Sequence, residues 1–200
     1  MVIEEEEDES SSRIDCPVLV TERLILRAPH VDDVPELSLL AANRRVAEMV
    51  ARMPHPYGEA EARAFVAASA KRRQGCVYAL TLSDTGAFIG CAALNETPRG
   101  LELGYWVGEP FWNRGFATEA AHALVDLAFR VTDVDCLHVS CRVLNGASRR
   151  VIQKCGFNYA GQGMIDSIAA GRVAVERYEL DRKTWASLRS WASAERMRPR

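Results

Sequence analysis

Hydrophobic residues along the chain change their spacing several times, and each change marks the border of a predicted element. Alternating hydrophobic and polar positions predict a first strand over 21–27. Apolar residues three and four apart then predict helical segments over about 32–50 and 59–73, separated by a proline-rich turn. Alternation returns at residue 77 and predicts a hairpin of two strands, over 77–82 and 87–94.

The second half of the chain continues this exchange between strand and helix. The elements predicted there are a strand over 101–107, a helix over 115–131, a strand over 136–143, a helix over 147–155, strands over about 157–165 and 172–180, and a helix from about 182. The order β-αα-βββ-α-β-α-ββ precedes that last helix. Because the central crossover helices stand next to strands, this order predicts an α/β fold, with a mixed α+β sheet covered by helices.

Composition narrows the class of protein. The 200 residues suffice for one domain, and 48% hydrophobic with 26% charged residues is typical of a globular protein. A formal charge of -2 lacks the positive field that holds nucleic acid, so no nucleic-acid partner is expected. No apolar run reaches the roughly 18 residues of a membrane helix, and the N-terminus lacks a signal-peptide pattern. We therefore expect a cytoplasmic protein without membrane contact.

The cysteines and histidines show no metal or disulfide pattern. The 6 cysteines stand at positions 16, 76, 91, 136, 141 and 155 without a C-x-x-C pair, so reduced thiols are expected. His122 and His138 have no second ligand at metal-binding spacing, so no metal is expected. Residues 1–15 combine like charges with small polar residues, which predicts a disordered acidic tail.

The stretch from Gly104 to Ala120 carries the strongest chemical signal. A predicted strand there runs through a short loop, with small residues at Gly115 and Ala117, directly into a helix. The first N–H groups of a helix have no partner within it, and the helix dipole adds positive charge, so an anion such as phosphate fits there. Arg114 adds a cation. The glycine patterns of dinucleotide folds and Walker loops are absent, so a different phosphate ligand is expected.

Three ordered blocks resemble the GNAT superfamily of N-acetyltransferases, and within it the RimJ/RimL-like subgroup. The block Trp112-Asn113-Arg114-Gly115-Phe116-Ala117 is similar to the family's pyrophosphate-binding motif, with Trp112 where the family has Gln or Arg. The second block, N-G-A-S from Asn145 with K-C-G-F ending at Phe157, resembles the subgroup's N-x-x-S and K-x-G-F pattern. The opening T-E-R-L-I-L-R matches as well. The resemblance covers about residues 19–180.

This resemblance implies acetyl-coenzyme A as the cosubstrate. Its pantetheine arm is expected to lie where the two central parallel strands, 101–107 and 136–143, splay apart. Backbone N–H groups would hold its pyrophosphate, at Arg114, Gly115, Phe116, Ala117 and Thr118, with charge from Arg114 and from Arg149 or Arg150. The resemblance further implies an acetyltransferase domain over 16–181, on which the helix over 182–200 packs.

The resemblance also implies roles in the reaction, which is direct attack of a primary amine on the thioester in a ternary complex. The Val107 N–H would stabilise the oxyanion, Asn145 would bond the pantetheine amide, and Ser148 would protonate the departing thiolate. Glu102 is the first candidate for the base and Glu109 the second. Two of these residues have a simpler interpretation: Glu102 can be a solvated strand carboxylate, and Ser148 can be a helix cap. An acetyl-cysteine at Cys141 is an alternative, although cysteines within strands are usually inert.

The acceptor is predicted only as an amine, on a peptide N-terminus or a small molecule. The segments 44–57 and 164–172 are expected to form its pocket, and Arg44, Arg45 and Arg52 favour an anionic acceptor. Two functions compete with catalysis: a catalytically silent coenzyme A sensor or interaction protein, and a nucleotide-binding module. Monomer and homodimer both remain open.

Overall fold

The computed structural model describes residues 16–71 and 75–196. The predicted tail over 1–15 lies outside this range, as does the end of the helix predicted over 59–73. The described chain forms an 8-stranded sheet in the order β1-β2-β3-β4-β5-β6-β8-β7. The strands are β1 (Leu19–Val20), β2 (Leu24–Arg27), β3 (Cys76–Leu82), β4 (Phe88–Thr97), β5 (Gly100–Val107), β6 (Cys136–Arg142), β7 (Asn158–Ser167) and β8 (Gly171–Asp181).

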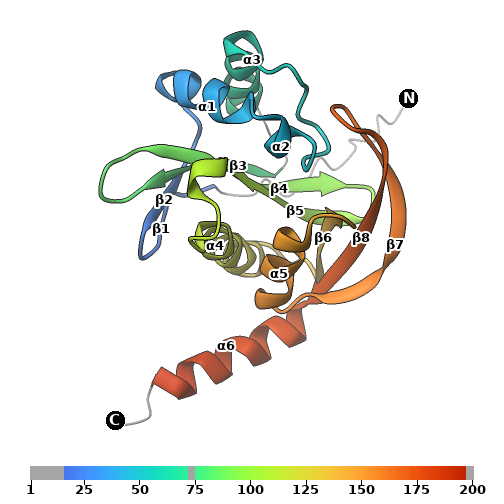
Figure 1. Cartoon of the computed structure of the whole chain (residues 1–200). Helices are drawn as coiled ribbons and strands as arrows, with labels where there is room; N and C mark the ends of the chain where they lie inside the picture. Colours follow the sequence, from blue (N-terminus) through green and yellow to red (C-terminus); the bar gives the residue numbers. More distant parts are fainter. Residues whose placement is uncertain (1–15, 72–74, 197–200) are drawn as a thin grey trace, which may run out of the picture.

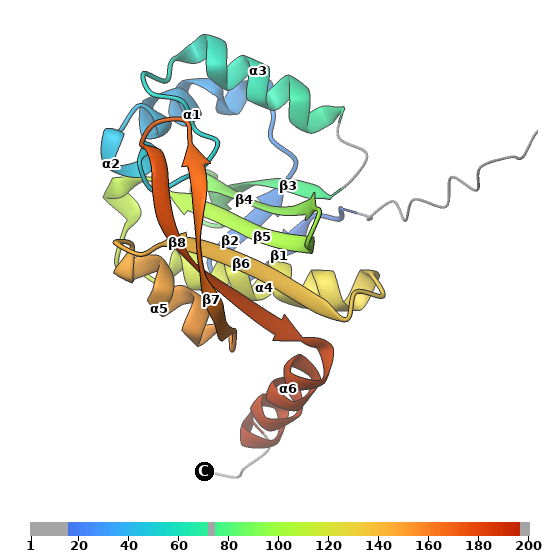
Figure 2. The same cartoon turned by 90° about the vertical axis from the view of Figure 1, so that its right-hand side faces the viewer.

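Helices cover both faces of this sheet (Figures 1 and 2). The helices are α1 (Val34–Ala41), α2 (Arg44–Ala47), α3 (Glu59–Ala70), α4 (Phe116–Val131), α5 (Gly146–Lys154) and α6 (Arg182–Arg196), with short 3-10 turns η1 (Val31–Asp33) and η2 (Glu109–Phe111). The first three lie on one face, and α4 and α5 lie on the other. The mixed fold predicted from the order of elements is confirmed.

Side-chain alternation on β5 separates the two cores. Leu101, Leu103 and Val107 point into a cluster with α4 and α5, whereas Trp106 packs with the cluster beneath α1 and α3. Successive residues of a strand point to opposite faces, so one strand serves both cores. Consequently β5 contributes side chains to both cores.

The two central strands separate at their carboxyl ends. β5 and β6 pair in parallel only at Glu102 with His138 and at Leu103 with Val139. Beyond these pairs each strand keeps its other partner, because β5 stays paired with β4 as far as Val107 and β6 with β8 as far as Arg142. The predicted splay is confirmed, and it opens a gap in the middle of the sheet.

The helix predicted over 32–50 is broken into η1, α1 and α2. The break falls at Asn43, whose backbone is extended and whose side-chain oxygen accepts the Arg45 N–H at 2.9 Å. An Asn side chain competes with the helix for backbone N–H groups, which favours a new N-cap over continuation. Hydrophobic spacing continues through the break, so periodicity alone does not locate it.

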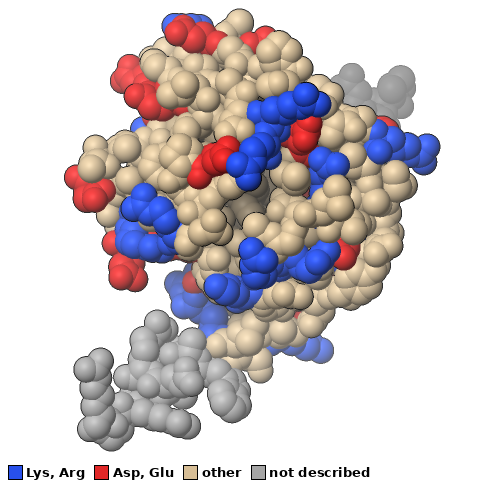
Figure 3. All heavy atoms as spheres, in the orientation of Figure 1, with Lys and Arg blue, Asp and Glu red and all other residues tan. Residues whose placement is uncertain are grey.

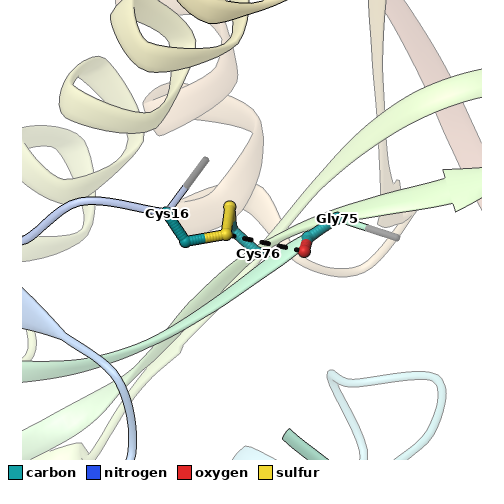
Figure 4. The surroundings of a disulfide bond; sticks show 3 residues. All are labelled: Cys16, Gly75 and Cys76. Atoms are coloured by element: carbon teal, nitrogen blue, oxygen red, sulfur yellow. Dashed lines mark hydrogen bonds between the residues drawn. A yellow bond between two sulfur atoms is a disulfide. The ribbon is translucent and has the colours of Figure 1, made fainter. Parts of the chain in front are cut away.

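A disulfide joins Cys16 to Cys76, with the two Cα atoms 5.7 Å apart (Figure 4). The Sγ atom of Cys16 also lies 3.7 Å from the carbonyl oxygen of Gly75. The expectation of reduced thiols is wrong for this pair, while Cys91, Cys136, Cys141 and Cys155 are free. The two partners are 60 residues apart in the chain, so only the fold brings their sulfur atoms together.

Helix α6 contacts the rest of the chain through its first turns. The Trp185 ring stacks on Phe129 with centroids 5.1 Å apart, and its indole N–H donates to Asp126 at 2.9 Å. Arg182 donates to backbone carbonyl groups at the end of α4, Phe129 and Thr132 among them. Arg189 also pairs with Asp126, and from there the helix extends away from the sheet (Figure 1). Among the described residues, no helix combines the length and apolar character needed to cross a membrane.

Candidate functional site

A cavity of about 570 Å³ lies where β5 and β6 diverge. The ends of both strands, the start of α4, the start of α5 and the segment from α2 to Val50 line it. Figure 3 shows the hollow near the centre of that view, with Lys and Arg side chains above and below it. A volume of this size is typical of small-molecule sites. Of the predicted cofactor-binding residues, all but Arg114 line this cavity: Val107, Gly115, Phe116, Ala117, Thr118, Asn145 and Ser148.

The residues at the start of α4 line the cavity, and their first backbone N–H groups have no partner within the helix. Gly115 precedes the helix with φ +82, a left-handed conformation that a residue with a side chain adopts at a cost. The first helical hydrogen bond runs from the Glu119 N–H to the Gly115 carbonyl, at 3.0 Å. The N–H groups of Phe116, Ala117 and Thr118 precede that bond, and Gly115 has no side chain to cap them. This end of the helix is therefore suited to a bound anion.

Arg23, in the turn before β2, braces this helix start together with Glu119 of α4, which the sequence analysis did not foresee. Arg23 donates to the Arg114 carbonyl at 2.9 Å, and its guanidinium lies 4.8 Å from the Phe116 ring centroid. Glu119 accepts from the backbone and side chain of Arg23, each at 2.8 Å, and from Thr21 at 2.7 Å. The T-E-R block contained this signal, but no spacing rule connects it to a helix so distant in the chain.

The network also sets the ionisation of Glu119. Burial alone would raise the pKa of this carboxyl, but hydrogen bonds from Thr21 and Arg23 and the Arg23 charge together lower it. A depressed carboxyl pKa contributes stability at neutral pH, and that stability is lost as pH falls through the folded-state value. The bracing of the α4 start should therefore weaken in acid.

Glu119→Gln is expected to lower the free energy of unfolding at pH 7 by about 1–3 kcal/mol, because a charged acceptor of several hydrogen bonds is lost. The difference in free energy of unfolding between the variant and the wild type should be constant at pH values above the ordinary carboxyl pKa of about 4.3. It should shrink at lower pH. Urea unfolding at a series of pH values measures both quantities. A difference that persists unchanged in acid would contradict this role for the Glu119 charge.

Tyr105 and Ser148 form a hydroxyl pair on the cavity wall. Their oxygens are 2.8 Å apart, and the Tyr105 hydroxyl also donates to the Ser148 carbonyl at 3.3 Å. Burial raises the pKa of Tyr105 far above its usual value of about 10, so it stays a neutral donor. The interpretation of Ser148 as helix cap is wrong, because Asn145 caps α5 by accepting the Ser148 N–H at 3.0 Å.

Cys141 also lines the cavity, beside Ser148. Burial raises the pKa of its thiol to about 11, although a hydrogen bond with Ser148 lowers it slightly. A thiol with this pKa is almost entirely protonated at neutral pH, whereas the thiolate is the nucleophile. These surroundings disfavour the alternative in which Cys141 carries the acetyl group.

Trp112 occupies the position at which the motif departs from Gln or Arg. Its indole N–H donates to the Val107 carbonyl at 2.6 Å, and the Arg45 guanidinium lies 5.2 Å from its ring centroid. The ring packs against both cores and lines the cavity. Trp112 thus ties the loop before α4 to the end of β5.

Neither predicted base is positioned at the cavity. Glu102 lies where β5 and β6 are still paired, whereas Gly104 and Trp106, further along the same face, line the cavity. Glu109 is bound by the side chains of Asn43 and Arg45. Glu48, which the sequence analysis missed, is the carboxylate among the described lining residues, and Arg44 donates to it at 2.6 Å.

Some basic residues near the cavity are ion-paired and some line it, and Arg45 does both. Arg149 turns toward Glu176, with Nε 2.7 Å from the carboxylate, while Arg150 and Lys154 line the cavity from α5. Arg44 and Arg45 are ion-paired with Glu48 and Glu109. These pairings balance the charges of Arg44 and Arg45, two of the three arginines that favoured an anionic acceptor, and so weaken that hypothesis.

Comparisons with known proteins agree with this geometry. A family model described as an acetyltransferase (GNAT) domain matches residues 23–158. From Bacillus subtilis (strain 168), YdaF is 30% identical over 69 residues, 34% of this chain and 38% of that protein. The uncharacterized N-acetyltransferase YoaA of the same strain is 26% identical over 151 residues, 72% of this chain and 85% of that protein.

A solved structure has the same fold. RimL, a ribosomal L7/L12 alpha-N-protein acetyltransferase in complex with coenzyme A, superposes with a TM-score of 0.68 and 22% identity. The superposition covers 82% of this chain and 97% of RimL. In that complex coenzyme A is joined by a disulfide to a cysteine of RimL.

Proposed function

Because this chain belongs to the GNAT family of acetyltransferases, whose cosubstrate is acetyl-coenzyme A, we propose that it acetylates a primary amine by direct attack in a ternary complex. The observation that carries the proposal is one cavity at the strand splay, lined by both the α4 N-terminus and the Tyr105–Ser148 pair. A diphosphate and a thioester require these two kinds of groups at opposite ends of one site.

The cofactor would lie with its pyrophosphate on the N–H groups at the start of α4. The charges of Arg114, Arg150 and Lys154 would balance its phosphates. Its pantetheine arm would pass between β5 and β6, where Asn145 lines the wall with an amide N–H group that capping does not use. The thioester would then lie between Val107 and Ser148.

The proposed reaction is nucleophilic substitution at the thioester carbonyl. The neutral amine attacks carbon, a C–N bond forms, and the Val107 N–H stabilises the oxyanion of the tetrahedral intermediate. When the C–S bond breaks, Ser148 donates its proton to the thiolate, and Tyr105 holds the serine hydroxyl in place and returns a proton to it. The amine loses its surplus proton to water, which reprotonates Tyr105.

Few carboxylates of the described residues line the cavity to act as a base for the amine. This supports an α-amine as acceptor, because an α-amine loses its proton more readily than a lysine amine. Among the described lining residues, Glu48 is the carboxylate, and Arg44 already binds it. An α-amine with a pKa near 8 is roughly one tenth neutral at pH 7, whereas a lysine amine with a pKa near 10.4 is neutral to well below one part in a thousand. RimL, which resembles this chain, acts on a protein α-amine.

The direct test measures acetyl-coenzyme A consumption with three matched acceptors. These are a peptide with a free N-terminus, the same peptide with a blocked N-terminus and one lysine, and a panel of small primary amines. Turnover of the free N-terminus or of a small α-amine above the lysine peptide is the expected result. Binding of acetyl-coenzyme A without release of the thiol for any acceptor would favour the silent sensor instead.

A covalent trap tests the cofactor position separately from turnover. We expect coenzyme A disulfide to modify Cys141: its thiolate attacks one sulfur, a new S–S bond forms, and the other coenzyme A leaves as thiolate. Because burial raises the pKa of Cys141 to about 11, trapping should accelerate about tenfold per pH unit from pH 7 to 9. Intact-mass spectrometry with peptide mapping measures the adduct and its rate.

The trap has two internal controls. Cys141→Ala should abolish this adduct, and excess acetyl-coenzyme A should protect Cys141 by occupying the same binding site. Cys136 lies outside the lining residues, so its reaction with glutathione disulfide should be unaffected by acetyl-coenzyme A. Trapping at Cys141 that acetyl-coenzyme A does not slow would refute the proposed orientation of the cofactor.

A further inference from the structure

A second group of reactive side chains lies at the paired end of β5 and β6, away from the cavity. Cys136 and His138 alternate with Leu137 and Val139 on β6, so both side chains leave the face that is buried against α4. Glu179 of β8 stands directly opposite His138 in the sheet. One sulfur, one imidazole nitrogen and one carboxylate oxygen therefore lie within 4.8 Å of one another.

We propose that Cys136, His138 and Glu179 form a binding site for a divalent transition-metal ion, with zinc as the ion they suit best. Zinc binds thiolate at about 2.3 Å and imidazole or carboxylate at about 2.0–2.1 Å in tetrahedral geometry. Two such nitrogen and oxygen ligands would be about 3.3 Å apart. His138 Nδ1 and Glu179 Oε1 are separated by 3.4 Å, so these two atoms already stand at the required spacing.

A positively charged side chain, that of Arg99, already contacts two of the three proposed ligands. The Arg99 Nη2 atom lies 3.2 Å from Glu179 Oε1 and 3.5 Å from His138 Nδ1, so it contacts both proposed ligands. Arg99 stands on the turn from β4 to β5, and its side chain is 37% exposed. It can move into solvent when an ion enters, so Arg99 and the metal would compete for the same two atoms.

The surroundings favour three protein ligands and a water. Asp181, opposite Cys136 in the sheet, is engaged as a cap of α6, with its oxygens accepting from the Thr184 N–H at 2.9 Å and hydroxyl at 2.7 Å. Glu179 is 43% exposed and His138 12% exposed at the side chain, so an ion and one water can reach the site. A thiolate and an imidazole disfavour Mg²⁺ and Ca²⁺, which prefer six or more oxygen ligands.

Sequence spacing did not reveal this site. Cys136 and His138 are separated by a single residue, and Glu179 comes from another strand, so no ligand motif is present in the sequence. Only the antiparallel register of β6 with β8 supplies the third ligand. Zinc binding would release the Cys136 thiol proton to solvent and join β6 to β8 through their side chains.

The test uses the whole chain, freed of metal with a chelator and kept without reductant so that the Cys16–Cys76 disulfide stays closed. Competition with a chromogenic zinc chelator should give one Zn²⁺ per chain. Cys136→Ser and His138→Gln should each weaken binding at least about tenfold. Cobalt(II) should give a thiolate-to-metal absorption band that is lost in Cys136→Ser, and none of these readouts depends on acetyl transfer.

Arg99→Ala provides the sharpest comparison, because it keeps all three proposed ligands and removes their competitor. This variant should bind zinc more tightly than the wild type, and equal affinity would overturn the shared position of ion and guanidinium. His122→Gln, which removes a histidine from α4, serves as the matched control and should bind like the wild type. Zinc uptake that is the same in Cys136→Ser and His138→Gln as in His122→Gln would overturn the site.

Discussion

Ala117→Glu is expected to weaken acetyl-coenzyme A binding at least about a hundredfold, a loss of about 2.7 kcal/mol. Ala117 lies in the first turn of α4 and lines the cavity. A carboxylate there would lie in the proposed pyrophosphate-binding site and repel the pyrophosphate. Two like charges about 4 Å apart near a protein surface repel by about 4 kcal/mol. The same carboxylate favours the helix, because negative charge at an N-terminus interacts well with the dipole.

This opposition between folding and binding makes the variant informative. Calorimetry should show weak cofactor binding, while thermal unfolding of the free protein should occur at the wild-type temperature or above. Ala67→Glu places the same charge at an exposed position of α3 and controls for net charge. Ala117→Gln controls for size and should lose less affinity than Ala117→Glu. Equal binding by Ala117→Glu and Ala67→Glu would show that the diphosphate does not sit on α4.

Ser148→Ala is expected to lower kcat about a hundredfold while the KM for acetyl-coenzyme A changes little. General acids contribute 10²–10⁴-fold, and a thiol with a pKa near 8.5 leaves readily, so the lower end applies. Tyr105→Phe should have a smaller effect, because it removes the partner of the Ser148 hydroxyl, 2.8 Å away, and not the donor itself. Steady-state kinetics with the best acceptor measures both variants.

The double variant distinguishes a proton-donating pair from two independent contacts. If Tyr105 acts through Ser148, Tyr105→Phe with Ser148→Ala should be no slower than Ser148→Ala alone. Ser148→Thr retains a hydroxyl and should recover most of the lost rate. A Ser148→Ala enzyme that changes only KM would exclude the acid role and leave Ser148 as a binding residue.

Much of the fold follows from local patterns. The alternation over 87–94 and the three-and-four spacing of α4 predict their elements within a few residues, because each reflects one buried face. The Asn43 break interrupts no hydrophobic pattern, so hydrophobic spacing does not reveal it. The binding turn from Arg114 to Thr118 is likewise local, because the loop and the helix that form it are consecutive.

The positions that local patterns do not reveal depend on contacts between distant parts of the chain. Glu102 lies on the strand leading to the cavity, but where β5 and β6 separate depends on their partners β4 and β8. The disulfide spans 60 residues, and Glu119 bonds the Arg23 backbone across 96. Such pairings follow from sheet order and register, which no single window of sequence contains.

Consecutive residues were sufficient to give the order of elements, the family and the helix start that suits a diphosphate, because hydrophobic period and helix termini are local properties of the chain. The tertiary structure settles which side chains become neighbours: Ser148 meets Tyr105 at the cavity, Glu102 stays outside it, and Cys136 and His138 face Glu179 at the paired end of the strands. The physical reason is that strand pairing fixes these neighbours. Each strand has several possible partners, and the packing of the whole chain selects among them.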